Sequence, residues 1–242
     1  MSFSSTVLST FWSPSRALAE AREQSRIAWP VIVSTAASLA FAAALLPRLD
    51  LEHGIAEELD EASATQKMSP HEREDAIASG VKLGKIGAAA RAALGPAFRA
   101  AAFALALWLA FMVAGGKPRF LPTLAVTAHA TLPEALRALL SLPALLTRPT
   151  LAPQDLPTLL PSNLAAYLVE PTAPLGPVAL LTSLDLFSLW TGVLLVIGLA
   201  GAAQVSRLRS AVTVTVMGMA CFAVFDLALP ALALSAAGKG QP

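Results

Sequence analysis

The feature that most constrains this chain is an apolar run at residues 178–203, which carries one charge, Asp185, in 26 residues. In a helix that rises about 1.5 Å per residue this run reaches roughly 39 Å, whereas the hydrocarbon core of a bilayer is about 30 Å thick. That length favours a transmembrane helix over a buried helix of a soluble protein. Lipid is therefore the expected solvent for the chain.

The composition agrees with a membrane protein. Of the 242 residues, 55% are hydrophobic and 14% are charged, whereas about 25% of the residues in a typical soluble domain are charged. The net charge of +1 gives no reason to expect a nucleic-acid partner. The single cysteine, Cys221, excludes an intrachain disulfide. The dominance of Ala and Leu points to a bacterial genome and thus to a bacterial inner membrane.

Four more segments are predicted to span the membrane, at residues 30–46, 97–114, 120–147 and 211–236. Between and around the five spans lie a leader at 1–29, loops at 48–94 and 148–177, and a tail at 237–242. The span at 120–147 is ambiguous because Pro133 can kink it or start a new helix. A re-entrant hairpin is the alternative for this span, but the charges of the loops require a full crossing.

Basic residues set the orientation of these spans. Seven Lys and Arg residues fall in three short regions that a five-span topology places on one side: Arg16, Arg22, Arg26, Lys117, Arg119, Arg207 and Arg209. Because short cytoplasmic loops are enriched in Lys and Arg, the N-terminus is predicted to be cytoplasmic and the C-terminus outside. The expected fold is an all-α polytopic membrane bundle of five transmembrane helices.

Two helices outside the spans complete this prediction. Ser13-Pro14 is a helix start, and the short amphipathic helix after it is not shaped like a signal peptide. The aromatic residues Phe11, Trp12 and Trp29 are expected to anchor it at the membrane interface, although a solvated leader is the alternative. In the first outer loop, Ser69 and Glu72 have the spacing of a capping box, which predicts an extracytoplasmic helix.

Ionisable residues inside the spans are the main candidates for a site. Asp185 and Asp226 are expected about 10 and 15 Å from the outer ends of their spans, with Arg137 at a similar depth and Glu134 one turn away. Because intramembrane charges usually pair with one another, we expect a polar cluster in the outer half of the bundle. Such a cluster either locks the packing, with Asp185 as a helix cap, or serves transport.

Small residues predict close helix contacts at Gly198, Gly201 and Gly218. No catalytic, cofactor-binding or metal-binding residue is expected. The chain lacks the motifs GxSxG, CxxC and GxxxxGK[ST], and His53, His71 and His129 are scattered without ligand spacing. The sequence therefore predicts a protein with no enzymatic activity.

Several stretches resemble the Yip1 family of five-span membrane proteins in its bacterial form. They are FWSPSR at 11–16 with Trp29-Pro30, the turn GGK at 115–117, FLPTLAVTAHATLPEAL at 120–136, and LDLFSLW at 184–190 running into IGLA at 197–200. The resemblance implies this family's fold and a membrane location. Eukaryotic members contact Rab GTPases through a longer cytoplasmic N-terminus, so no GTPase partner is expected here.

The expected function is that of an accessory or scaffold subunit. It would bind membrane lipids, another membrane protein such as a transporter permease, or a second copy of itself. The alternative is a small transporter, or a component of a transport complex, that uses the intramembrane Arg and Asp residues. A transporter needs a water-accessible path beyond the cluster, whereas a scaffold needs an exposed interface.

Overall fold

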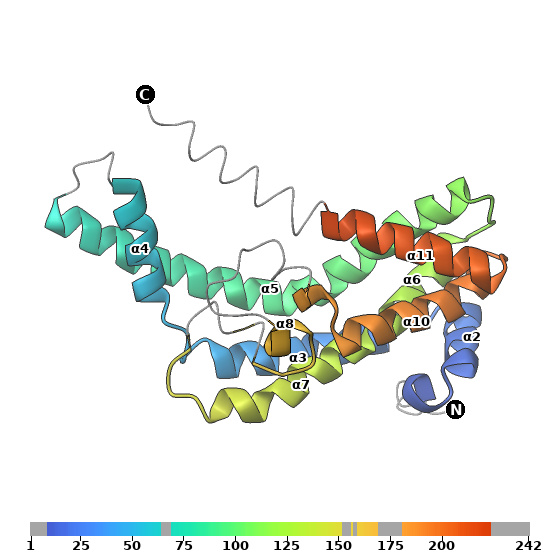
Figure 1. Cartoon of the computed structure of the whole chain (residues 1–242), viewed down its shortest axis with the longest axis horizontal. Coiled ribbons are helices and arrows are strands. Elements are labelled where there is room, and N and C mark those ends of the chain that lie inside the picture. The colour runs from blue at the N-terminus through green and yellow to red at the C-terminus, as the bar shows by residue number, and fades with distance from the viewer. Residues whose placement is uncertain (1–8, 64–68, 152–155, 157–158, 169–180, 224–242) are drawn as a thin grey trace.

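The computed structural model describes residues 9–63, 69–151, 156, 159–168 and 181–223, and every regular element within them is a helix (Figure 1). The helices are α2 (Pro14–Gln24), α3 (Ala28–Leu45), α4 (Leu51–Ser63), α5 (Pro70–Val113), α6 (Phe120–Ala130), α7 (Leu132–Leu146), α8 (Ala165–Leu168), α10 (Leu186–Ala202) and α11 (Arg207–Phe222). The all-α prediction is therefore confirmed. Asp226 and the tail lie outside the described residues.

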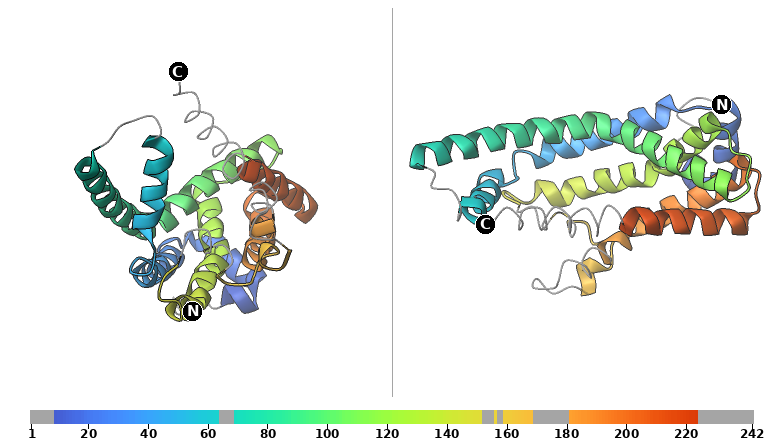
Figure 2. Two further views of the ribbon diagram at one scale, coloured as in Figure 1. Left: turned by 60° about the vertical axis from the view of Figure 1, so that its left-hand side comes forward. Right: turned by 90° about the horizontal axis from the view of Figure 1, so that it is seen from above.

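The helices form an elongated bundle in which two groups are staggered along the long axis (Figures 1 and 2). α3 packs against α7 and α5 towards one end. α2, α10 and α11 lie towards the other end, where α2 and α10 pack on α6 and α11 packs on α10 and α5. The long helix α5 and the consecutive pair α6 and α7 run through both groups.

α5 is longer than the sequence indicated. The capping box is present, with Ser69 N–H donating to the Glu72 carboxylate at 2.8 Å and Glu72 N–H donating to Ser69 Oγ at 3.3 Å. The helix continues through Pro96 and is 44 residues long. At about 1.5 Å per residue this is roughly 66 Å, so α5 combines the expected outer helix with the span at 97–114.

α4 packs along the beginning of α5 as a helical hairpin. The guanidinium of Arg73 makes three hydrogen bonds to the Asp60 carboxylate, at 2.8 to 3.1 Å. At Gly80 a Cβ would come within 3.2 Å of Ile55, so the missing side chain lets the two helices approach closely. The predicted outer loop at 48–94 is thus largely helical.

The expected helix at 120–147 is divided into α6 and α7. Pro133 occupies the first turn of α7, where its missing N–H leaves no hydrogen bond unmade. The prediction that Pro133 can start a new helix is confirmed.

The expected helix at 178–203 is also interrupted, at 184–185 within its described part, and α10 begins only at Leu186. The Asp185 side chain accepts backbone N–H groups at the start of α10 and so sets where this helix begins. Hydropathy does not report such a hydrogen bond, so it could not reveal the break.

By length and composition, α3 and α5 are long and apolar enough to cross a membrane, and α10 is a shorter apolar helix. The core lies where α2, α5, α6, α10 and α11 meet. Its most buried side chains include Leu18, Leu107, Phe111, Val126, Leu194 and Leu199. Many large apolar side chains elsewhere on α5, α10 and α11 face outward, as a surface bathed in lipid requires.

Candidate functional site

Asp185 is the centre of a polar cluster at the start of α10. One carboxylate oxygen accepts the N–H groups of Phe187 at 2.8 Å and Ser188 at 3.4 Å, which makes Asp185 the N-cap of the helix. The other oxygen accepts the hydroxyl of Ser162, from the loop before α8. The residue is 1% exposed. Both oxygens are therefore engaged in holding local structure.

Arg137 and Glu134, on α7, complete the cluster. The Arg137 Nε atom lies 3.7 Å from Asp185 Oδ2, and an Arg137 Nη atom lies 3.9 Å from Glu134 Oε2. Ser188 donates its hydroxyl to Glu134 Oε1 at 3.3 Å. The structure thus brings together Glu134, Arg137 and Asp185, three of the four expected members; Asp226 lies outside the described residues.

The position of Asp185 differs from the expectation in one respect. The carboxylate does not project from the middle of a span, because Asp185 precedes the first residue of α10. Its contacts tie three parts of the chain together: α7, α10 and the loop at 159–168. These contacts agree with the alternative in which the cluster locks the packing, and the choice between packing and transport stays a prediction.

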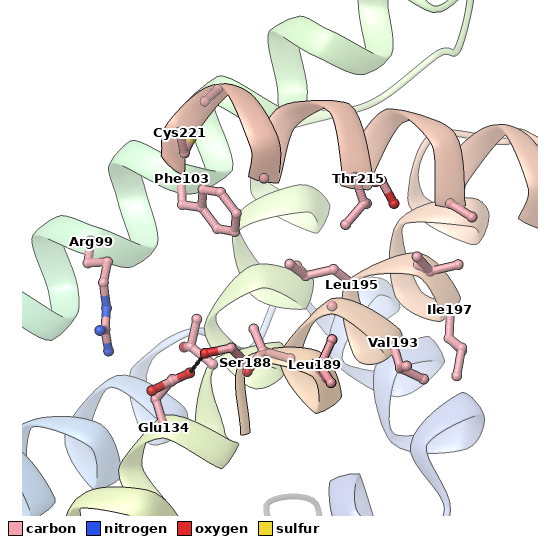
Figure 3. A pocket seen from close by; sticks show the side chains of 18 of the residues that line it. Arg99, Phe103, Glu134, Ser188, Leu189, Val193, Leu195, Ile197, Thr215 and Cys221 are labelled. Carbon is pink, nitrogen blue, oxygen red and sulfur yellow. Dashed lines mark hydrogen bonds between the residues drawn. The ribbon is translucent and has the colours of Figure 1, made fainter. Parts of the chain in front are cut away.

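A cavity of about 1200 Å³ opens between α5, α10 and α11 (Figure 3). One face of α5 and one face of α11 line it, together with much of the surface of α10, and most of the lining is apolar, as at Phe103, Val193 and Val214. Arg99, Glu134 and Ser188 lie at the same end of the cavity (Figure 3). The cavity is larger than the typical range of about 300–1,000 Å³ for ligand pockets, and like them it combines apolar walls with a few polar groups.

A second, smaller cavity of about 360 Å³ lies on the other side of the cluster. Arg137, Ser141 and Thr182 contribute polar atoms to its lining. Glu134 lines both cavities.

The three glycines selected for close packing behave differently. A Cβ at Gly198 would lie 2.4 Å from Val126 on α6 and 3.3 Å from Leu18 on α2, and one at Gly201 would lie 2.1 Å from the Arg22 guanidinium. These two glycines let α2 and α6 approach α10. Gly218 has no described atom within 4 Å of its Cβ position and lines the large cavity, so a role in helix packing at this position stays a prediction.

The leader helix uses its apolar face within the protein. Ala17, Leu18 and Ala21 of α2 are buried, and α2 contacts α6 and α10. Phe11 packs edge-to-face on Trp190 with 5.2 Å between ring centroids. Trp12 is 87% exposed and Trp29 is 39% exposed, and their contact with the membrane interface stays a prediction.

A comparison with known protein families matches the Yip1 domain over residues 8–228. The chain belongs to the Yip1 family. The match extends from the leader through α11, so the resemblance seen in the sequence is confirmed, and the chain is a membrane protein of this family. Neither the curated proteins nor the solved structures contain a match.

Sequence reasoning missed three features of this Yip1-family site. Ser162 donates a hydrogen bond to Asp185, 23 positions away, and Ser188 donates one to Glu134, 54 positions away. Nothing in the neighbouring sequence indicates such distant contacts. The place of Arg99 in the lining of the cavity depends on how α5 packs, which the sequence does not show. No group of three His, Cys, Asp or Glu residues that could hold a metal ion occurs among the described residues.

Proposed function

We propose that this Yip1-family protein is a non-enzymatic accessory protein of a bacterial inner membrane. It organises the lipids or membrane proteins around it through the cavity between α5, α10 and α11. The observation that carries the proposal is this cavity, a large space with mainly apolar walls on a protein that belongs to a membrane family. An apolar surface of this size marks a place for an apolar partner.

The polar cluster supports this reading over chemistry or transport through Asp185. The Asp185 carboxylate caps α10, accepts the hydroxyl of Ser162 and lies beside the guanidinium of Arg137. Further along α10 lies the densely packed apolar core around Leu194 and Leu199. A carboxylate engaged in this way serves best as a tie that keeps α7 and α10 in place beside the cavity.

The proposed topology has five spans with the N-terminus inside. Three basic regions gather at one end of the molecule, as the positive-inside pattern requires. Lys117 N–H donates to the Ala203 carbonyl at 2.9 Å, which joins the two basic turns. The Arg22 guanidinium lies beside Gly201, one residue before the end of α10. This end would then face the cytoplasm.

Purification from native membranes in a gentle detergent, followed by native mass spectrometry, tests the proposal. The wild-type protein is expected to carry a bound lipid or protein at a fixed stoichiometry. Gly218→Leu places a larger side chain in the cavity and should weaken this binding, whereas Gly87→Leu is a matched control on α5, because Gly87 also has free space at its Cβ position but does not line the cavity. Equal occupancy in both variants, or none in the wild type, would overturn the proposal.

A second candidate function is transport, and the place of Glu134 in the lining of both cavities favours it. A carboxyl group that lines two spaces can pass a proton or a cation from one space to the other. In liposomes loaded with a pH dye, Glu134→Gln would then abolish a flux that the wild type supports. An absence of flux in the wild type would remove this candidate.

A further inference from the structure

Given the proposed function of the cavity, we propose that its occupant is a phospholipid whose headgroup carries both a phosphate and a primary ammonium group, as in phosphatidylethanolamine. The acyl chains would lie between α5, α10 and α11. The headgroup would lie at the end that holds Arg99 and Glu134.

The walls of the cavity match acyl chains. On α11 the lining residues recur at intervals of three or four, as at Ala211, Val214, Gly218 and Cys221, so one continuous face of the helix is turned to the cavity. Gly218 and Gly192, on α10, have no atom within 4 Å of their Cβ positions, which leaves the space beside both helices open. A flexible hydrocarbon chain can fill such an irregular space without a matching surface of its own.

The polar end carries charges of both signs. Figure 3 shows the guanidinium of Arg99 pointing to the side of the cavity where Glu134 and Ser188 lie. Arg99 has no ion-pair partner among the residues that the structure describes, so its five N–H donors are available to a phosphate. Glu134 accepts one hydrogen bond from Ser188 and lies 3.9 Å from Arg137, and a carboxylate can accept more.

This combination selects one class of occupant. An apolar helix of a partner protein would leave Arg99 without a counter-charge and would offer no further donor to Glu134, which is unfavourable in a membrane. An anionic lipid such as phosphatidylglycerol would meet Arg99 but would bring only neutral hydroxyl groups, and no positive charge, to Glu134. A primary ammonium can donate hydrogen bonds to the Glu134 carboxylate, whereas the quaternary ammonium of a choline headgroup has no N–H to donate. Charge complementarity therefore favours the aminophospholipid.

The test is a lipid competition followed by native mass spectrometry. The delipidated full-length protein is mixed with equal amounts of phosphatidylethanolamine, phosphatidylcholine and phosphatidylglycerol that share the same acyl chains. We expect phosphatidylethanolamine to be retained about tenfold more than either competitor, the factor that corresponds to about 1.4 kcal/mol at 25 °C. Glu134→Gln should remove this preference but keep binding, and Arg99→Gln should weaken the retention of all three lipids.

Three controls separate binding from folding. Ser188→Ala removes a neutral contact of Glu134 but keeps the carboxylate, and Arg99→Lys keeps the cation, so both should retain the preference. Gly218→Leu should weaken the retention of every lipid. A wild-type preference for phosphatidylglycerol, or no preference, would overturn the aminophospholipid and leave the proposed function standing. If the wild-type protein retains no lipid but binds a protein that Gly218→Leu binds more weakly, only the lipid inference fails. If it retains neither a lipid nor a protein, the lipid inference and the proposed function both fail.

Discussion

The guanidinium of Arg137 lies 3.7 Å from the buried carboxylate of Asp185, across the contact between α7 and the start of α10. The same carboxylate caps α10, so one side chain fixes both the beginning of a helix and its neighbour. This relationship joins α7 to the start of α10. Glu134, which lies one turn before Arg137 on α7, lines the polar end of the large cavity.

The helix-capping hydrogen bonds of Asp185 should contribute more to the stability of the fold than the negative charge of its carboxylate does. Replacing an N-cap Asp by Ala costs about 0.5–2 kcal/mol, while Asn caps as well as Asp does. We therefore expect Asp185→Ala to lower the thermal unfolding midpoint in detergent clearly, and Asp185→Asn to lower it much less. Arg137 is 30% exposed, and partly exposed ion pairs contribute about 0–1 kcal/mol, so Arg137→Gln should also have a small effect. Equal losses in both Asp185 variants would show that the charge dominates.

The glycines of α10 and α11 should differ in their tolerance of a methyl group. Gly198→Ala would place Cβ against Val126, whose β-branched side chain has little rotamer freedom, and overpacking of this kind costs about 1–3 kcal/mol. Gly201→Ala meets only the flexible end of Arg22 and should cost less. Gly218→Ala should be neutral or stabilising, since Ala favours helices.

Thermal unfolding of these three variants checks that order. The double variant Gly198→Ala with Val126→Ala should recover part of the loss, because the clash is removed. A Gly218→Ala variant as unstable as Gly198→Ala would contradict the packing described here.

The capping box at the start of α5 predicts a dependence on pH. Hydrogen bonds from the Ser69 side chain and then from its backbone N–H lower the pKa of Glu72 below its ordinary value of 4.5. Since the folded state binds the proton less well, this contribution to stability is present above about pH 4.5 and is lost as the pH falls through the folded-state pKa. Carbon NMR of the Glu72 carboxyl group should show the lowered pKa.

Substitutions at Ser69 provide the control for this titration. Ser69→Ala should raise the Glu72 pKa towards its ordinary value, and Ser69→Thr should leave it lowered, because the hydroxyl group remains. An unchanged titration in Ser69→Ala would show that the side-chain hydrogen bond has no influence.

Much of the cluster could be predicted because lipid imposes a strict rule on charges. Arg137, Glu134 and Asp185 stand out as rare ionisable residues in apolar runs, and such residues must find one another or water. The helix start at Pro133 and the capping box at Ser69 follow from local backbone chemistry. These features depend on neighbours in the sequence or on a single general constraint.

The other features depend on which helix faces meet. Gly198 and Gly218 look alike in the sequence, yet one packs on Val126 and the other borders a cavity. Asp185, which caps α10 at the break before Leu186, also accepts a hydrogen bond from Ser162 in a distant loop. The staggering of α3 against α10 likewise leaves no trace in hydropathy, since apolar helices look the same at any height along a bundle.

The most direct measurement uses Cys221, the only cysteine of the chain, which lines the large cavity. A photoreactive maleimide attached to it would be activated in native membranes, and the adduct identified by mass spectrometry. We expect a phospholipid adduct from Cys221 and little from a Gly87→Cys control in a Cys221→Ser background. A protein adduct would keep the accessory function but exclude the lipid. Equal yields from both positions would contradict a specific binding cavity between α5, α10 and α11.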